Sequence, residues 1–436
     1  MRRLDFSESS YETADTLSEA NSSQVSKPDS ESTFCLGINS SFVSVTPLAV
    51  NKRILARKNL QAYSKSKSLA TVSEGSLKSS MQPARALFNY YEFLSDFEME
   101  EIRSYSEVFY VGQNCQKSLK NRKKHTNSEG YYIGAVGDHL AYRYEIKSIL
   151  GTGNFGEVFL CWDHKQANQI AVKVSRIQEN YRKATEDESE ILTQLSLSED
   201  PSKDHIIEKY SDFEFRNHFC MGVEVLSLSL KDSMEKRNYQ GLPLHHIRRI
   251  AIQTLSALTL IHSHKIIHCD LKPDNILLLS QKRFDIKIID FGSASQEGSN
   301  AKEYVQSRPY RAPEIVIEAP YNKSIDIWSF ACILVEIATG QQLFPAISEM
   351  QLFRMFIETI GMPSMEFLNR GKRKQLYVLP NGKMKVAAKA FECGIETRLQ
   401  GLDPRFIELI KECLKWDPEE RITVEGALGH RWILDN

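Results

Sequence analysis

One stretch of the chain constrains its fold more than any other: the segment from His268 to Leu279, which Asp290-Phe291-Gly292 follows after a short gap. Two apolar runs, 276–278 and 286–289, predict short buried strands joined as a hairpin, which would hold the neighbouring polar side chains on a rigid base. A single Asp or Asn is most often a turn cap or a solvated charge, but here several polar residues fit one kind of chemistry. They are an acid that can take a hydroxyl proton, a cation for phosphate charge and two oxygen ligands for Mg²⁺, respectively Asp270, Lys272, Asn275 and Asp290. The pattern predicts phosphoryl transfer, which proteins catalyse mainly by positioning and charge stabilisation.

The composition is that of a globular protein with a sizeable core, since 42% of the 436 residues are apolar. The formal net charge is −1, so no global field attracts nucleic acid or a membrane, and we expect neither as a partner. No run approaches the roughly eighteen apolar residues of a membrane span, and the residues after Met1 lack the apolar core expected of a signal peptide. The eight cysteines have no zinc-like spacing, which indicates free thiols in a reducing compartment. We therefore expect a cytoplasmic or nuclear protein, or one that is both.

The N-terminal part of the chain predicts little ordered structure. Residues 1–83 are rich in Ser, Thr, Asn and Lys without periodicity, and they indicate a disordered tail. Basic residues among its serines could dock partners, or the tail could be a solvated linker. From Ala84 to Gly112 apolar and acidic residues recur, as in a short helix and an extended segment that dock on the next domain. The basic run 117–124 that follows is either a nuclear-localisation or phosphate-binding patch or a solvated loop.

A glycine-rich turn lies between the first two of three predicted strands, 144–150, 157–163 and 169–174. Its glycines, Gly151, Gly153 and Gly156, would let backbone N–H groups approach phosphates, and the strand that follows argues against a dinucleotide-binding fold, in which a helix follows.

Lys173 lies in the third of these strands, among apolar residues, so its charge needs a partner. Glu188, on a predicted helix over 182–195, is the natural one. Val158 and Ala171 would face an adenine ring from above, and Leu277 would face it from below.

The remaining chain predicts one further strand and several helices. The strand spans Phe213 to Leu226 and ends in a hinge at Val223-Glu224-Val225-Leu226. Helical spacing of apolar residues follows at 247–261, 325–339, 350–360 and 406–414, so the second half of the chain is mostly α-helical.

The region from Tyr144 to Trp432, with these residues in order, resembles the eukaryotic protein kinases. The resemblance implies an α+β, two-lobed fold: a small antiparallel N-lobe sheet with one main helix (144–225), and a larger, mostly α-helical C-lobe (226–434). It further implies ATP and Mg²⁺ as cofactors, Asp270 as catalytic base with Lys272 beside it, and Asn275 and Asp290 on the metal. By the same resemblance, the nucleotide would contact Gly151, Gly153, Gly156, Val158, Ala171, Lys173 (paired with Glu188), Val223, Glu224, Leu226 and Leu277. Asp326 would brace the catalytic loop, and Arg421 would pair with Glu314.

Within the kinases, the sequence is most similar to the dual-specificity tyrosine-regulated kinase (DYRK) family, in particular its second class. The motifs that carry this similarity are His268-Cys269-Asp270, Gln306-Ser307-Arg308, the segment 138–145 and Phe215-Arg216-Asn217-His218. Residues 84–143 then resemble the family's homology box and linker. Three positions depart from the family: Val223 replaces a Phe at the back of the ATP pocket, Pro309 replaces an aromatic residue, and Lys302 replaces the first tyrosine of a Tyr-x-Tyr pair.

The family resemblance implies a monomeric dual-specificity kinase that phosphorylates Ser or Thr of protein substrates and its own Tyr304. Arg308 and Arg311 would hold the phosphate on Tyr304, and Asp232 and Asp274 would pair with an arginine upstream of the phosphoacceptor. A non-catalytic scaffold of the same fold and a metabolic kinase are the alternatives. The filled catalytic positions favour an enzyme over a scaffold. The long segment from Asp290-Phe291-Gly292 to Ala312-Pro313-Glu314, which would be the activation segment of a kinase, favours a protein substrate over a metabolite.

Overall fold

The computed structural model describes residues 80–115, 125–280, 283–298 and 304–435. The predicted tail up to residue 79, the basic run at 117–124 and Lys302 lie outside the described residues.

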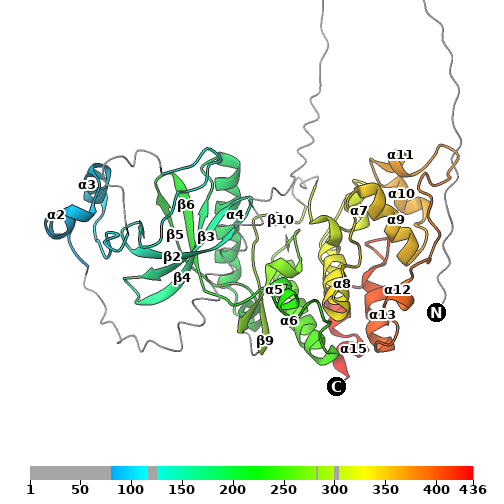
Figure 1. The fold of residues 1–436 in the computed structure, drawn as a ribbon. Coiled ribbons are helices and arrows are strands. Elements are labelled where there is room, and N and C mark those ends of the chain that lie inside the picture. Colours follow the sequence, from blue (N-terminus) through cyan, green and yellow to red (C-terminus); the bar gives the residue numbers. More distant parts are fainter. Residues whose placement is uncertain (1–79, 116–124, 281–282, 299–303, 436) are drawn as a thin grey trace, which may run out of the picture. The chain divides into compact units, whose positions relative to one another are not determined.

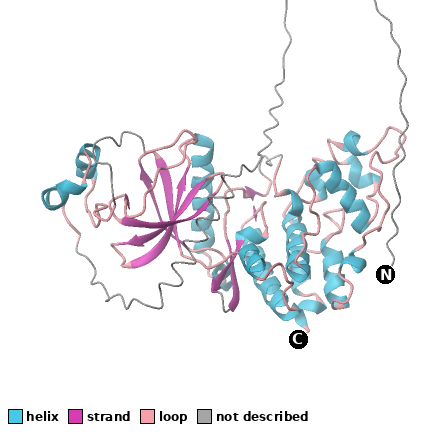
Figure 2. Ribbon diagram, viewed as in Figure 1, coloured by secondary structure: helices cyan, strands magenta, loops and turns pink. Residues whose placement is uncertain are grey.

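An antiparallel sheet of six strands forms the N-lobe (Figures 1 and 2), in the order β1-β2-β3-β4-β6-β5. The strands are β1 (His139–Leu140), β2 (Tyr144–Thr152), β3 (Gly156–Asp163), β4 (Asn168–Ser175), β5 (Lys209–Phe215) and β6 (His218–Val223). One long helix, α4 (Glu179–Ser196), packs beside β4, β5 and β6. A short 3₁₀ helix, η3 (Pro201–His205), connects α4 to β5.

The single strand predicted over Phe213–Leu226 is wrong, because a hairpin divides this segment. Arg216 and Asn217 adopt positive φ angles of 51° and 65° between β5 and β6. A two-residue turn with both residues left-handed matches the twist of antiparallel strands, and Asn tolerates this conformation better than most residues. Asn217 was therefore the sequence signal for the turn.

The two faces of the sheet are buried in different cores. Directly opposite residues share a face, so the register places Ala171 and Val223 together, and their side chains join the core that continues into the C-lobe. On the other face, Phe159, Val172 and Cys220 belong to a separate cluster. Burial on both faces explains why β4 reads as a continuous apolar run and not as an alternating one.

The segment ahead of the sheet forms two short helices where one was predicted. These are α2 (Pro83–Tyr90), extended by η1 (Tyr91–Phe93), and α3 (Asp96–Glu101), extended by η2 (Ile102–Ser104). Ser95 and Glu98 form a capping box that starts α3. Apolar side chains of this segment pack around Tyr142 in a small core of their own.

A buried cation joins this segment to the sheet. The Arg216 side chain is only 3% exposed, and its guanidinium lies 3.2 Å from Glu98 Oε1 and 2.8 Å from Glu101 Oε2. The turn between β5 and β6 is therefore held by two carboxylates of α3.

The C-lobe is mostly helical, which agrees with the predicted α+β class and its two lobes (Figure 2). Its central helix, α8 (Ser324–Thr339), is buried on nearly all sides and ends at Gly340, whose φ is 76°. The other helices are α5 (Leu230–Lys236), α6 (Leu244–Ser263), α7 (Pro313–Val316), α9 (Glu349–Ile360), α10 (Met365–Asn369), α11 (Lys374–Tyr377), α12 (Ile395–Arg398), α13 (Pro404–Cys413), α14 (Val424–Leu428) and α15 (Arg431–Leu434), with the 3₁₀ helices η4 (Pro273–Asn275) and η5 (Arg308–Tyr310).

Two small antiparallel sheets lie beside these helices. The predicted hairpin is present as β8 (Ile276–Ser280) and β9 (Arg283–Ile288), and β7 (Ile266–Ile267) pairs with β10 (Ser295–Gln296). Across the described ranges, the helices are all too short or too polar to cross a membrane.

Candidate active site

The predicted partner of Lys173 lies beside it. Lys173 Nζ is 2.5 Å from Glu188 Oε2 and 3.1 Å from Asp290 Oδ1, so one ammonium joins β4, α4 and the segment after β9. The backbone N–H of Phe291 donates to the other Glu188 oxygen at 3.1 Å. Burial lowers the pKa of Lys173, but the Asp290 and Glu188 carboxylates outweigh it and hold that pKa above its usual value. The lysine is thus charged and fixed.

Asp270 lies at the centre of the catalytic loop, and its carboxylate is hydrogen-bonded on both oxygens. Oδ1 accepts from the backbone N–H and the hydroxyl of Ser307 at 3.1 and 2.8 Å, while the Lys272 ammonium contacts Oδ2. These bonds aim the carboxylate at the place where the activation segment passes. Sequence reasoning named Ser307 only within a family motif and missed its contact with Asp270.

The loop that carries Asp270 is held in an unusual backbone shape. Cys269 has a φ of 63°, a conformation that costs energy for a residue with a side chain. Asp326, at the buried start of α8, accepts hydrogen bonds from the backbone N–H groups of His268 and Cys269, at 2.9 and 3.1 Å. Asp326 therefore has the bracing position predicted for it.

The two candidate metal ligands meet at one end of the β8–β9 hairpin. The Ile289 N–H donates to the Asn275 carbonyl at 3.0 Å, which places Asp290 next to Asn275. The Asn275 amide nitrogen donates to the Asp270 carbonyl at 2.9 Å, so its orientation is fixed. Lys173 lowers the pKa of Asp290 despite its burial, and the carboxylate is ionised at neutral pH. A carboxylate and an amide are the oxygen donors that suit Mg²⁺, so these residues fit the metal.

The candidate nucleotide site lies under the glycine turn. Val158 is directly opposite Lys173 in the sheet, and Ala171 is directly opposite Val223. The rest of the predicted lining lies where the lobes join. Leu226 follows β6, and Leu277 lies in β8, where it bridges to Ser229.

Glu224 of the hinge is tied to both lobes. Its backbone N–H donates to the Glu208 carbonyl at 3.0 Å, and its carboxylate lies 2.6 Å from Lys287 Nζ on β9. The nucleotide roles of these residues stay predictions.

The three glycines of the turn differ in why they are needed. A Cβ on Gly156 would lie 2.0 Å from the Val174 carbonyl oxygen, so this glycine lets β3 pack closely on β4. A Cβ on Gly151 would meet nothing within 4 Å, and one on Gly153 would only reach the Gly156 carbonyl oxygen at 4.0 Å. Those two positions leave room for a phosphate approach.

Phe155, at the tip of the turn, lies near the metal end of the site. Its ring is 5.8 Å from Lys173 Nζ, and it borders a cavity of about 400 Å³. Asp270, Gly292, Tyr304 and Ser307 line the same cavity, so Tyr304 and the Asp270 carboxylate border the same space.

Only one of the two predicted arginines contacts Tyr304. Tyr304 is 58% exposed, and the Arg311 guanidinium lies 3.9 Å from the centroid of its ring. Arg311 also donates to the Val305 and Gln306 carbonyls at 3.1 and 2.8 Å. Arg308 points elsewhere and donates to the Ile347 carbonyl at 2.8 Å.

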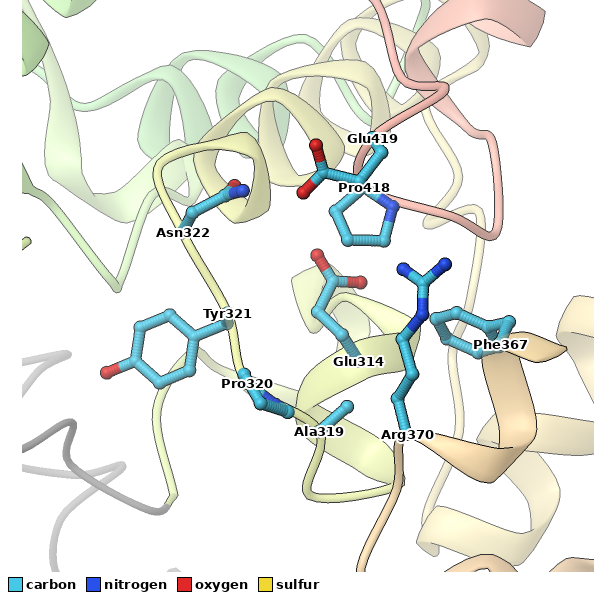
Figure 3. Close-up of a pocket in the computed structure, with 9 residues that line it drawn as sticks. All are labelled: Glu314, Ala319, Pro320, Tyr321, Asn322, Phe367, Arg370, Pro418 and Glu419. Atoms are coloured by element: carbon cyan, nitrogen blue, oxygen red, sulfur yellow. The ribbon is translucent and has the colours of Figure 1, made fainter. Parts of the chain in front are cut away.

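The pair predicted between Glu314 and Arg421 is present and fully buried. Two parallel bonds of 2.8 and 3.0 Å join the side chains, and Arg421 also donates to the carbonyls of Ser324 and Lys415. Figure 3 shows Glu314 at the wall of a second cavity, of about 380 Å³, opposite Arg370 and Pro418. The pair ties the end of the activation segment to the base of the C-lobe.

The two acids expected to bind a substrate arginine have partners within the chain. Asp232 forms a capping box with Ser229 at the start of α5. Asp274 Oδ1 lies 3.1 Å from Lys231 Nζ. Lys231 had no role in the sequence analysis, because nothing in its local pattern shows that α5 faces η4.

The chain also matches a known family model. The match to the protein kinase domain covers residues 144–433. The chain belongs to the protein kinases. Its relatives place it among the DYRK kinases: it is 38% identical over 382 residues to the mouse (Mus musculus) dual specificity tyrosine-phosphorylation-regulated kinase 3. That match covers 81% of this chain and 65% of the mouse protein.

Two further relatives show how far the similarity to DYRK and Ser/Thr kinases extends. The dual specificity tyrosine-phosphorylation-regulated kinase 3 of Macaca fascicularis is 37% identical to this chain, and the match covers 81% of this chain and 67% of the relative. The serine/threonine-protein kinase ppk5 of Schizosaccharomyces pombe is 38% identical over 78% of this chain and 43% of its own length. This chain therefore spans about two-thirds or less of the length of these relatives.

Proposed function

We propose that this DYRK-family chain transfers the γ-phosphoryl group of ATP to Ser or Thr hydroxyls of protein substrates. One observation carries the proposal: Lys173, Glu188 and Asp290 form a connected charged group, and Asn275 joins Asp290 to the loop of Asp270. A scaffold without catalysis would not need all of these side chains held together.

In the reaction, Asp270 accepts the proton of the substrate hydroxyl. The hydroxyl oxygen forms a bond to the γ-phosphorus, and the bond from the γ-phosphorus to the oxygen that leaves with ADP breaks. Lys272, next to Asp270, lies where it can offset negative charge on the transferred group. Lys173 would hold the phosphates that stay with ADP. Asn275 and Asp290 would hold Mg²⁺, which when bound neutralises phosphate charge.

The direct test is a phosphorylation assay on a degenerate peptide library with radiolabelled ATP. We expect transfer to Ser and Thr peptides, with none from the Asp270→Asn protein. ATP binding by the wild type without transfer to any peptide would support the scaffold alternative and refute the proposal.

We also propose that the kinase phosphorylates its own Tyr304. A phosphotyrosine brings about two negative charges at neutral pH, and Arg311 already lies over the ring. Arg308, four residues along, would have to leave the Ile347 carbonyl to join it. Protein made in bacteria should carry phosphate on Tyr304 by mass spectrometry, and the Asp270→Asn protein should lack it.

A Tyr304→Phe variant separates the phosphate from the ring. Phe keeps the aromatic contact with Arg311 but has no hydroxyl to modify, so we expect its activity toward peptides to fall several-fold. If Tyr304→Phe or an unmodified wild type is fully active, the tyrosine is a packed aromatic side chain and the proposal fails.

A further inference from the structure

The ammonium of Lys231 forms an ion pair with the carboxylate of Asp274, which follows the loop of Asp270. Lys231 Nζ and Asp274 Oδ1 are 3.1 Å apart, and the two side chains are 36% and 34% exposed. Ser229 and Asp232 cap the start of α5 and fix the backbone that carries Lys231. The pair is therefore positioned by the helix start, and water still reaches it.

A second carboxylate, Glu336 of α8, lies near enough for the charges of the pair to act on its pKa. Burial raises the pKa of Glu336, the Asp274 charge adds to this rise, and the Lys231 charge opposes it. Tyr310 donates its hydroxyl to Glu336 at 2.6 Å, and Gln342 reaches that hydroxyl at 3.4 Å. The charges of Asp274 and Lys231 therefore both act on Glu336.

Asp274 and Tyr310 lie close in sequence to the two residues that meet at the proposed catalytic base. Asp274 follows Asp270 by four residues, and Tyr310 follows Ser307 by three. Ser307 donates its hydroxyl to Asp270, and Tyr310 donates its hydroxyl to Glu336. A peptide whose hydroxyl reached Asp270 would therefore pass close to Asp274.

A guanidinium suits such a site better than an ammonium does. Arginine is planar and can donate to a carboxylate through two parallel bonds, whereas lysine is a single flexible point charge. A partly exposed ion pair is weak, so an incoming arginine can displace Lys231, but it must compete with it.

We propose that Lys231 determines substrate specificity: it occupies the cation site at Asp274 and reduces the preference of this kinase for substrates with an arginine near the phosphoacceptor. The inference rests on the proposed function, and it refines the substrate class. Lys231 touches neither the reacting atoms nor Asp270, so its effect falls on peptide affinity and not on turnover.

The test replaces Lys231 with methionine, which keeps an unbranched side chain and removes the charge. Two Ser peptides are compared that differ only by Arg or Ala, with the Arg placed in turn at each of the four positions before the serine. The ratio to compare is kcat/KM for the Arg peptide divided by kcat/KM for the Ala peptide. At the Arg position that gives the largest ratio, we expect Lys231→Met to raise this ratio about five- to tenfold, because KM for the Arg peptide falls. The Ala peptide should change little, which also shows that the variant folds.

Two further variants make the result specific. Lys236→Met removes an exposed lysine from the last turn of the same helix, and it should leave the Arg-to-Ala ratio unchanged. Adding Asp274→Asn to Lys231→Met should abolish the gain, since the carboxylate that binds the guanidinium is then lost. An unchanged or lower ratio for Lys231→Met overturns the inference.

The failure of this inference is distinguishable from failure of the proposed function. Peptide affinity measured by fluorescence anisotropy needs no turnover. If the wild type transfers no phosphate to either peptide, the proposed function fails. If the wild type phosphorylates both peptides but Lys231→Met binds the Arg peptide no tighter, only the role of Lys231 fails.

Discussion

An Asp270→Asn variant is expected to lose at least about a hundredfold in kcat while it stays folded, the scale for one positioned acid–base group. The amide keeps the size of the carboxylate and can still accept the Ser307 bonds, but it cannot take the hydroxyl proton. Steady-state kinetics with a Ser peptide measures the loss, and a thermal melt close to that of the wild type excludes unfolding.

A matched control is Asp285→Asn, the same substitution on β9 at a residue that pairs with the surface guanidinium of Arg249. We expect nearly wild-type kcat from this control. If Asp270→Asn were equally active, Asp270 would not be the base, and phosphoryl transfer would need another proton acceptor.

Breaking the buried pair of Arg421 and Glu314 should lower stability far more than breaking an ion pair on the surface. Both side chains are 0% exposed, and Arg421→Met leaves the Glu314 carboxylate buried without its cation. We expect the free energy of unfolding to fall by about 3–5 kcal/mol, as in other buried pairs that lose one partner. Urea denaturation measures this change in the free energy of unfolding. The change follows from the shift of the unfolding midpoint, provided that the dependence of the free energy on urea concentration keeps the same slope in both proteins.

Two comparisons separate this loss from the mere removal of an arginine. The double variant Arg421→Met with Glu314→Leu removes both charges and should recover part of the stability, because no isolated charge is then buried. Arg370→Met breaks a bidentate pair with Asp417 on the surface and should change the midpoint little. Equal losses from Arg421→Met and Arg370→Met would contradict the expectation.

The sequence was most informative where one local pattern determines a contact. Lys173 lies in an apolar strand and its charge needs a partner, and the next helix offers Glu188 at a suitable distance along the chain. The β8–β9 hairpin followed from two apolar runs close together. The helical C-lobe followed in part from the 3.6-residue period of the apolar residues in α6.

The sequence was least informative where tertiary contacts decide. The hairpin at Arg216 and Asn217 was missed because apolar residues continue on both sides of the turn. Gly156 fits the pattern of a phosphate-binding glycine, but its close approach to Val174 is set by the pairing of β3 with β4. The Lys231 contact with Asp274 joins residues 43 apart in sequence, and no periodicity encodes it.

Arg216 also determines where the folding unit of this chain begins. It lies inside the segment that matches the kinase domain, but the carboxylates that neutralise it, Glu98 and Glu101, lie ahead of that segment. A shortened chain that begins at Tyr144 would keep the cation and lose both anions. The unit that unfolds cooperatively is therefore expected to begin upstream of the segment that matches the kinase domain, and a substitution at Glu98 or Glu101 is expected to cost less stability when Arg216 is changed with it.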